Sequence, residues 1–147
     1  MKTALILEEI LGKRAVLMLY SKQPKVRAQA FHNLNHGLSK FDFSQIEKQE
    51  RQQIFVALFA VLNKGCADND IQVNMYAIEL LLNMMKNHYK NFEELEDENH
   101  KKEFNQHVDQ IIESLLFRLG SENKGLKEKS KEALGLVSHY PIMNYAE

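Results

Sequence analysis

Residue types that mark several protein classes are scarce in this chain. Its 147 residues include one cysteine, Cys66, so no internal disulfide can form and a reducing compartment is expected. Two prolines and six glycines leave few residues for turns, which favours a helical fold. No apolar stretch approaches the roughly 18–20 residues that span a bilayer. Glu8 and Glu9 also end the first apolar run well short of a secretion signal. We therefore expect a cytoplasmic protein without a membrane partner.

The charge balance argues against a second class of partner. The formal net charge is -1, whereas a nucleic-acid-binding domain is expected to carry a basic excess on one face. We therefore expect no nucleic-acid partner. Hydrophobic residues make up 44% of the chain and charged residues 27%, which is a globular composition, and the length suits a single domain over residues 1–147.

The sequence contains no pattern typical of catalysis or of a cofactor. Cys66 has no motif partner that would serve as base or orienting group, and no glycine-rich phosphate loop follows a strand. His32 and His36 are four residues apart and could face the same side of a helix, but no third metal ligand accompanies them at a recognisable spacing. We expect no enzymatic activity, no cofactor and no metal site.

A helix-opening pattern occurs three times along the chain. In each copy an apolar, a small and an apolar residue follow one another at steps of four, which places them on one helix stripe. The copies are Val26, Ala30 and Leu34; Val73, Ala77 and Leu81; and Leu126, Ser130 and Leu134. They are offset by 47 and then 53 residues. This is the length range of HEAT and armadillo units, in which stacked helix pairs share a core.

Breaks in the apolar periodicity divide the chain into six predicted helices. The predicted fold is all-α, an α-solenoid of about three HEAT-like helical hairpins with repeats at about 3–38, 44–90 and 101–140. The first helix is expected over about 3–20, with Leu7, Leu11, Ala15 and Met18 on one face. The last is expected to stop at Tyr140-Pro141.

Local residues predict where some helices begin and end. Ser44 to Glu47 has the pattern of a capping box, with the serine accepting from first-turn amides. Gly65 suits the left-handed position after a helix, and Asp68 or Asn69 is expected to cap the helix that follows. An acidic connector over residues 92–100 is expected to separate the second and third hairpins.

Stacked hairpins bring the turns inside each pair to one edge. The turns at residues 20–27, 64–71 and 120–127 are thus predicted to form a continuous ridge, here called the turn edge, and the acidic connector is predicted on the opposite edge. Basic residues at both ends of the ridge would steer an acidic partner to it. The lysines could equally be solvated loop residues, and Arg27 could brace the stack. The candidate binding residues are Lys22, Gln23, Lys25, Arg27, Asn69, Lys124 and Lys127.

The repeats also carry a resemblance to a known family. The copy beginning at Val26 looks like the HEAT motif, and the segment from Leu115 to Lys124 resembles the unit found in TOG domains. TOG domains are HEAT-repeat domains that bind tubulin through the turns inside their helix pairs. The likeness is to TOG domains of ciliary-tip centrosomal proteins in particular, and it rests on Gly12, Leu19, Tyr20, Ser21, Lys22, Arg27, Ala30, Leu82, Met85 and the last repeat.

The resemblance implies a function that the residues alone do not reveal. It implies binding to tubulin or microtubule ends, beside other ciliary or centriolar proteins, and a location at the cytoskeleton of a cilium or centriole. The alternative is an adaptor that binds a protein or peptide along the concave face of the second helices, where Gln29, Asn33, Gln72, Tyr76, Glu79 and Asn83 would matter. A third hypothesis is an internal segment of a longer helical array.

Overall fold

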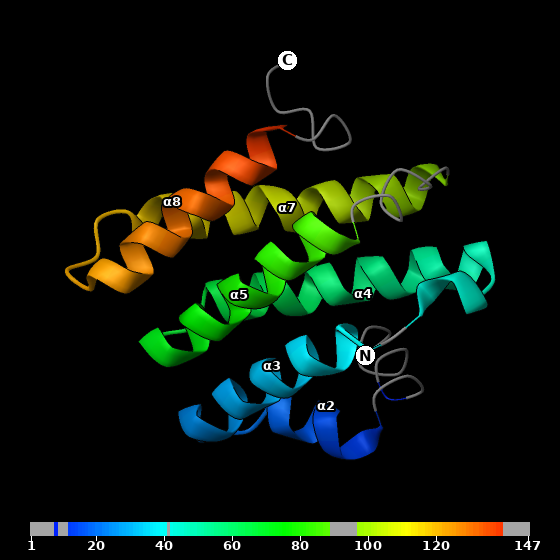
Figure 1. The fold of residues 1–147 in the computed structure, drawn as a ribbon, viewed down its shortest axis with the longest axis horizontal. Coiled ribbons are helices and arrows are strands. Elements are labelled where there is room, and N and C mark those ends of the chain that lie inside the picture. Colours follow the sequence, from blue (N-terminus) through cyan, green and yellow to red (C-terminus); the bar gives the residue numbers. More distant parts are fainter. Residues whose placement is uncertain (1–7, 9–11, 41, 89–96, 140–147) are drawn as a thin grey trace.

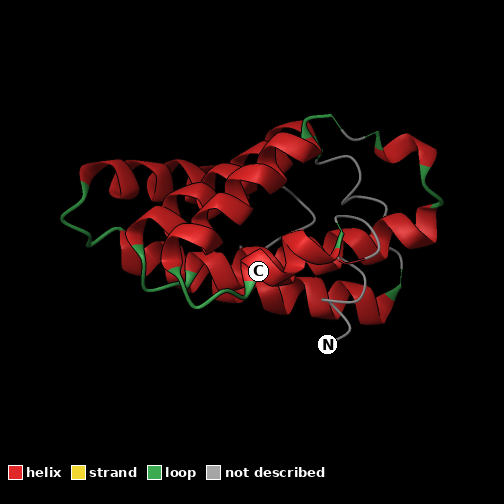
Figure 2. Cartoon of the chain, turned by 90° about the horizontal axis from the view of Figure 1, so that it is seen from below, coloured by secondary structure: helices red, strands yellow, loops and turns green. Residues whose placement is uncertain are grey.

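The described part of the protein is built from helices alone. The computed structural model describes residues 8, 12–40, 42–88 and 97–139, and this part contains no β-strand (Figure 2). Six α-helices and one 3₁₀ turn, η1, follow one another there. They are α2 (Lys13–Leu19), α3 (Pro24–Leu38), η1 (Phe43–Gln45), α4 (Lys48–Cys66), α5 (Ile71–Asn87), α7 (Glu98–Arg118) and α8 (Lys124–His139). The predicted all-α fold is confirmed.

The helices stack as three hairpins. Within a hairpin, α2 packs against α3, α4 against α5 and α7 against α8. Between hairpins, α4 packs on α7, while α5 lies between α3 and α8 (Figure 1). This arrangement is an α-solenoid of three HEAT-like helical hairpins, as predicted. None of the described helices is both long enough and apolar enough to cross a membrane.

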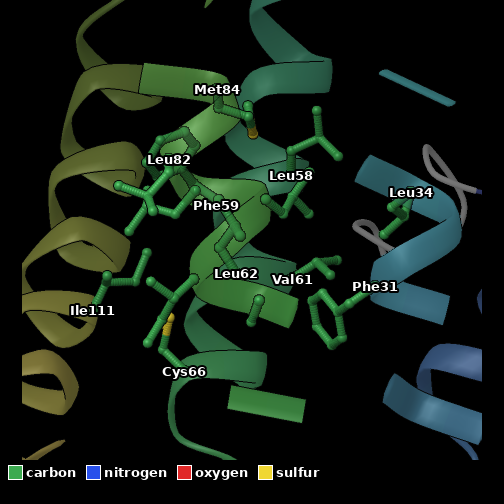
Figure 3. Close-up of a cluster of buried hydrophobic side chains, with 14 of the residues drawn as sticks. Phe31, Leu34, Leu58, Phe59, Val61, Leu62, Cys66, Leu82, Met84 and Ile111 are labelled. Atoms are coloured by element: carbon green, nitrogen blue, oxygen red, sulfur yellow. The ribbon is translucent and has the colours of Figure 1, made fainter. Parts of the chain in front are cut away.

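The core is centred on α4, the most densely apolar helix. Leu58, Phe59 and Leu62 of α4 lie between α3 on one side and α7 on the other (Figure 3). The ring of Phe59 also meets the ring of Phe104 of α7, with 4.6 Å between centroids. Full burial of one such side chain stabilises the fold by about 1.5–3 kcal/mol. The second hairpin therefore joins the other two, because α5 packs on α3 and α8 while α4 packs on α7.

The repeated stripe is part of this core in all three hairpins. In the second copy every member is buried, and in the first and third copies two of the three are buried and the other is partly buried. The partly buried members are Val26 and Leu134. The stripe thus identified the buried face of α3, α5 and α8.

The predicted first helix is wrong at Gly12. This residue has φ +92°, a conformation that side-chain-bearing L-residues rarely adopt, and α2 begins only at Lys13. Ala15 and Met18 lie in α2 and are partly buried. Leu7, Leu11, the connector residues before Asp97 and the predicted stop at Tyr140-Pro141 lie outside the described residues.

Several predicted helix ends are also wrong. The capping residue before α4 is not Ser44, because Asp42 accepts the Ser44 amide and opens η1 instead, and α4 starts at Lys48 without a side-chain cap. Neither Asp68 nor Asn69 caps α5: Asp70 does, accepting from the amide of Val73 at 3.1 Å. Asp42 thus opens η1 and not α4, whereas at α5 the acidic side chain directly before the helix provides the cap.

Gly65 has a packing role and not the predicted terminal one. α4 continues through it to Cys66, and the residue is buried. A Cβ atom at this position would lie 2.5 Å from the Phe31 ring and 2.6 Å from the Ala77 side chain. The glycine therefore lets α3 and α5 approach α4 closely.

Candidate partner-binding edge

The three turns inside the hairpins lie on one edge of the molecule, as predicted. Figure 1 shows the α2–α3, α4–α5 and α7–α8 turns at the left of the stack, with the start of α4 and of α7 at the opposite side. Side chains link neighbouring turns directly. The first turn is bonded to the second through Arg27, and the third hairpin to the second through Arg118. The turn edge is thus one connected surface.

All three turns are built in the same way. In each, a side-chain oxygen accepts a hydrogen bond from the amide two residues later: Ser21 from Gln23 at 3.1 Å, Asp68 from Asp70 at 3.0 Å, and Ser121 from Asn123 at 3.1 Å. These positions have the same offsets as the buried stripe. Short side-chain-to-backbone bonds of this kind fix a turn locally. The sequence signal for these turns is a serine or aspartate five residues before the first member of each stripe.

Arg27 connects the first two turns. Its Nε and Nη2 donate to the two carboxylate oxygens of Asp68 at 2.8 and 3.0 Å, and its Nη1 donates to the Ser21 carbonyl at 2.8 Å. The two side chains are only 15% and 7% exposed. Burial alone raises the pKa of Asp68, but hydrogen bonds from Arg27 and the Asp70 amide, together with the charges of Arg27 and Lys64, hold that pKa below its ordinary value. Arg27 therefore braces the stack, which was the alternative considered for it.

Lys64 makes a second link between these turns. Its Nζ donates to the Leu19 carbonyl at 3.2 Å and lies 5.1 Å from the centre of the Tyr20 ring. Burial lowers the pKa of Lys64, while the Asp68 carboxylate opposes that shift. Lys64 is thus occupied within the fold.

Two side chains hold the turn between α4 and α5, here called the middle turn, by hydrogen bonds to its backbone. The Nδ2 of Asn74, which is buried, donates to the carbonyls of Gly65, Cys66 and Asp68 at 3.0, 3.3 and 2.9 Å. The Nη2 of Arg118 donates to the same Cys66 and Asp68 carbonyls at 3.3 and 2.9 Å. The middle turn is therefore fixed by its own helix and by the third hairpin. Sequence reasoning missed both roles, since their partners are backbone atoms.

The other predicted binding residues remain exposed on this edge. Gln23 precedes α3 and Lys124 begins α8, while Lys22, Lys25, Asn69 and Lys127 also face solvent. Of the nearby carboxylates, Asp68 is paired with Arg27 and Asp70 caps α5, while Glu122 is exposed. The exposed charged side chains of the three turns are therefore four lysines and one glutamate.

Exposed apolar side chains gather at the same edge. Leu17 and Tyr20 lie at the end of α2, Ile71 opens α5, and Leu116 and Phe117 lie in the last turn of α7. These five are the exposed large hydrophobic residues of the described part of the chain. Their exposed fractions include 50% for Tyr20, 46% for Ile71 and 75% for Phe117. Apolar groups beside basic ones are typical of a protein-binding surface.

The face of the second helices has a different character. Its amide side chains bond one another: Gln29 donates to Asn33 at 2.8 Å, and Asn83 donates to Asn35 at 2.7 Å. Glu79 forms an ion pair with Lys129 at 3.5 Å, and Tyr76 packs against His32. Polar groups of this face are therefore satisfied within α3 and between neighbouring helices.

Two features of the described residues bear on the expected lack of a metal site and of a reactive cysteine. There, no three His, Cys, Asp or Glu side chains come together in a group that could hold a metal ion. Burial raises the pKa of the Cys66 thiol to about 12, against the opposing charge of Arg118. A thiol in this state is a weak nucleophile.

Comparison with known proteins finds similarity in fold. No family model matches the chain, and no curated protein matches its sequence. Two solved structures are similar, one described as the CEP104 TOG domain and the other as the TOG domain of human Cep104. Each gives a TM-score of 0.70 at 18% identity. The alignments cover 95% of this chain and 52% of the first, and 97% of this chain and 53% of the second.

These matches agree with the architecture described above. They extend over nearly all of this chain, and the chain spans about half the length of the solved TOG domains. The predicted likeness to the TOG domain of a ciliary-tip centrosomal protein is confirmed at the level of the fold. The chain therefore has a TOG-like fold of HEAT-type hairpins.

Proposed function

We propose that this chain is a non-enzymatic tubulin-binding module that contacts tubulin or microtubule ends through the turn edge. The observation that carries the proposal is the clustering of exposed lysines and exposed apolar side chains on the one edge formed by all three turns. The TOG-like fold supports the choice of tubulin as partner. A location in a cilium or centriole, beside other proteins of those structures, rests on the same likeness.

The geometry of the edge suits binding to a rigid acidic surface. Each turn is fixed by local hydrogen bonds, and the first two turns are joined by Arg27 and Asp68. Residues held in place before binding lose little conformational freedom on association. Exposed lysines then raise the rate of encounter with an acidic partner, while the apolar groups provide contact area.

Size-exclusion chromatography with tubulin tests the proposal. The variant Lys22→Glu/Lys25→Glu is expected to weaken binding, because both side chains are exposed on the first turn. Arg27 is left unchanged, since its reversal would also break the pair with Asp68. The matched control Lys40→Glu/Lys102→Glu changes the net charge by the same amount on the opposite edge. Lys40 follows α3 and Lys102 lies near the start of α7, and both are exposed, so this variant is expected to bind like the wild type.

Two results would contradict this proposal in different ways. If the wild-type chain did not bind tubulin, the function itself would be wrong. If it bound and the reversal on the first turn had no effect, the assignment to the turn edge would be wrong. The adaptor alternative predicts that this reversal leaves partner binding unchanged and that substitution of Asn33 or Asn83 abolishes it.

A further inference from the structure

The last turn of α7 presents the most exposed apolar surface of the turn edge. Phe117 is 75% exposed and its neighbour Leu116 is 54% exposed. A phenylalanine that faces water without contacting a partner loses the benefit of burying its ring, which is about 1.5–3 kcal/mol. Two adjacent, strongly exposed apolar side chains therefore indicate a binding site, whereas a single exposed leucine would need no explanation.

The ring is held in a defined place. The guanidinium of Arg118 lies 5.1 Å from the centre of the Phe117 ring. The same guanidinium donates to the Asp68 carbonyl at 2.9 Å, so its position is set by the middle turn. Phe117 is thus supported by a fixed cation, and little ordering of the ring is needed for contact with a partner.

The surroundings argue against the packing of a further helix on this side chain. Phe117 shares a helix stripe with Gln106, Gln110 and Glu113, at the same three- and four-residue steps that unite the buried stripe of α7. All three are polar and exposed. A stacking face would be apolar along several turns, as the face with Phe104, Val108, Ile111 and Leu115 is. Apolar exposure here is confined to the end of the helix, beside the turn.

The exposed charge in the turn that follows Phe117 and in the start of α8 is mainly basic. Lys124 and Lys127 are exposed in the first turn of α8, and Glu122 is the exposed carboxylate between the helices. An apolar group at the centre with charged groups around it is the usual organisation of a protein-binding site. A complementary surface would have an apolar pocket with carboxylates beside it.

We propose that Phe117, supported by Leu116, is an apolar anchor that enters a pocket on the bound protein, while carboxylates beside the pocket face Lys124 and Lys127. This inference rests on the proposed function and identifies the third turn as a contact that sets affinity. Aromatic residues at such positions commonly contribute a large share of the binding free energy. An apolar contact is also insensitive to salt, whereas contacts of the exposed lysines are screened.

Tubulin affinity of Phe117→Ala, measured by calorimetry at about 50 mM and about 300 mM salt, tests the inference. The expected loss is about tenfold or more, by the same factor at both salt concentrations. Lys124→Glu/Lys127→Glu should lose more affinity at the lower concentration. The control Gln106→Ala, on the same stripe about three turns earlier, should bind like the wild type. Phe117→Leu, which keeps an apolar side chain, should retain most of the affinity.

The outcomes separate this inference from the function on which it rests. Equal affinity of wild type and Phe117→Ala would overturn the anchor while leaving tubulin binding intact. A change in self-association of Phe117→Ala with unchanged tubulin affinity would also overturn it, since the residue would then serve contact between copies. Absence of tubulin binding in the wild type and in every variant would instead reject the proposed function.

Discussion

The carboxylate of Asp68 accepts two hydrogen bonds from the guanidinium of Arg27, at 2.8 and 3.0 Å, across 41 residues of sequence. This pair joins the first turn to the second at the edge where we propose that tubulin binds. Its planar, two-bond geometry fixes both distance and orientation between the hairpins. The regular spacing of the turn edge therefore depends on an ion pair as well as on the apolar core.

Replacement of Arg27 by methionine should destabilise the protein. The Asp68 side chain, which is 7% exposed in the intact pair, would lose its charged partner, and we expect a loss of about 3 kcal/mol in the free energy of unfolding. Urea unfolding followed by circular dichroism measures this. The control Lys86→Met removes an exposed ion pair with Glu132, and its cost should stay below about 1 kcal/mol. Similar losses in both variants would indicate that the Arg27 pair behaves as an ordinary surface pair.

The same pair should make stability depend on acid pH. Burial opposes the shift, but hydrogen bonds from Arg27 hold the folded-state pKa of Asp68 below its ordinary value of 3.8. The unfolded chain then binds a proton more readily, so the contribution of Asp68 to stability is present above about 3.8 and is lost as pH falls through the lower folded-state pKa. Unfolding of wild type and Asp68→Asn from about pH 6 to about pH 2 should give curves that converge in acid. A constant difference across this range would contradict the prediction.

Helical periodicity was sufficient to predict the general architecture. Steps of three and four residues depend only on local geometry, and they identified the buried stripe of α5 through Val73, Ala77 and Leu81. Antiparallel hairpins then require their internal turns to share an edge. Exposure of Phe117 could also have been predicted, because it falls outside the stripe that ends at Leu115.

The errors arose where a residue's role depends on distant neighbours. Gly65 is required by Phe31 and Ala77, which belong to other helices, so the local sequence suggested a helix end instead. For Arg27, both partner binding and bracing of the stack were left open, because its acceptor, Asp68, lies in another hairpin. Periodicity determines which face of a helix is buried, but it does not determine which polar groups will meet.

Substitution of Gly65 by alanine tests the close approach of the helices. Alanine normally stabilises a helix interior by up to about 1 kcal/mol relative to glycine. Here the new Cβ would lie 2.5 Å from the Phe31 ring, and we expect overpacking to cost about 1–3 kcal/mol in the free energy of unfolding. Gly135→Ala in α8, where nothing lies within 4 Å of the added atom, should be neutral or stabilising. Stabilisation by both substitutions would show that α3 and α5 can move away from α4.

The rate at which Cys66 reacts with a thiol reagent should report how often the middle turn opens and exposes this buried residue. Its thiol is buried and has a pKa of about 12, so at about pH 8 only roughly one molecule in ten thousand carries the reactive thiolate. Native protein should therefore resist iodoacetamide, and labelling should become fast once denaturant unfolds the chain.

The variant Arg118→Met separates opening of the turn from activation of the thiol. Loss of the Arg118 charge raises the thiol pKa further, because that charge favours the thiolate. It also removes the hydrogen bonds from Arg118 to the Cys66 and Asp68 carbonyls. Faster labelling of this variant can then come only from more frequent opening, and Lys127→Met should label at the wild-type rate because Lys127 is exposed. Rapid labelling of the native wild type would instead mean that the middle turn does not enclose Cys66.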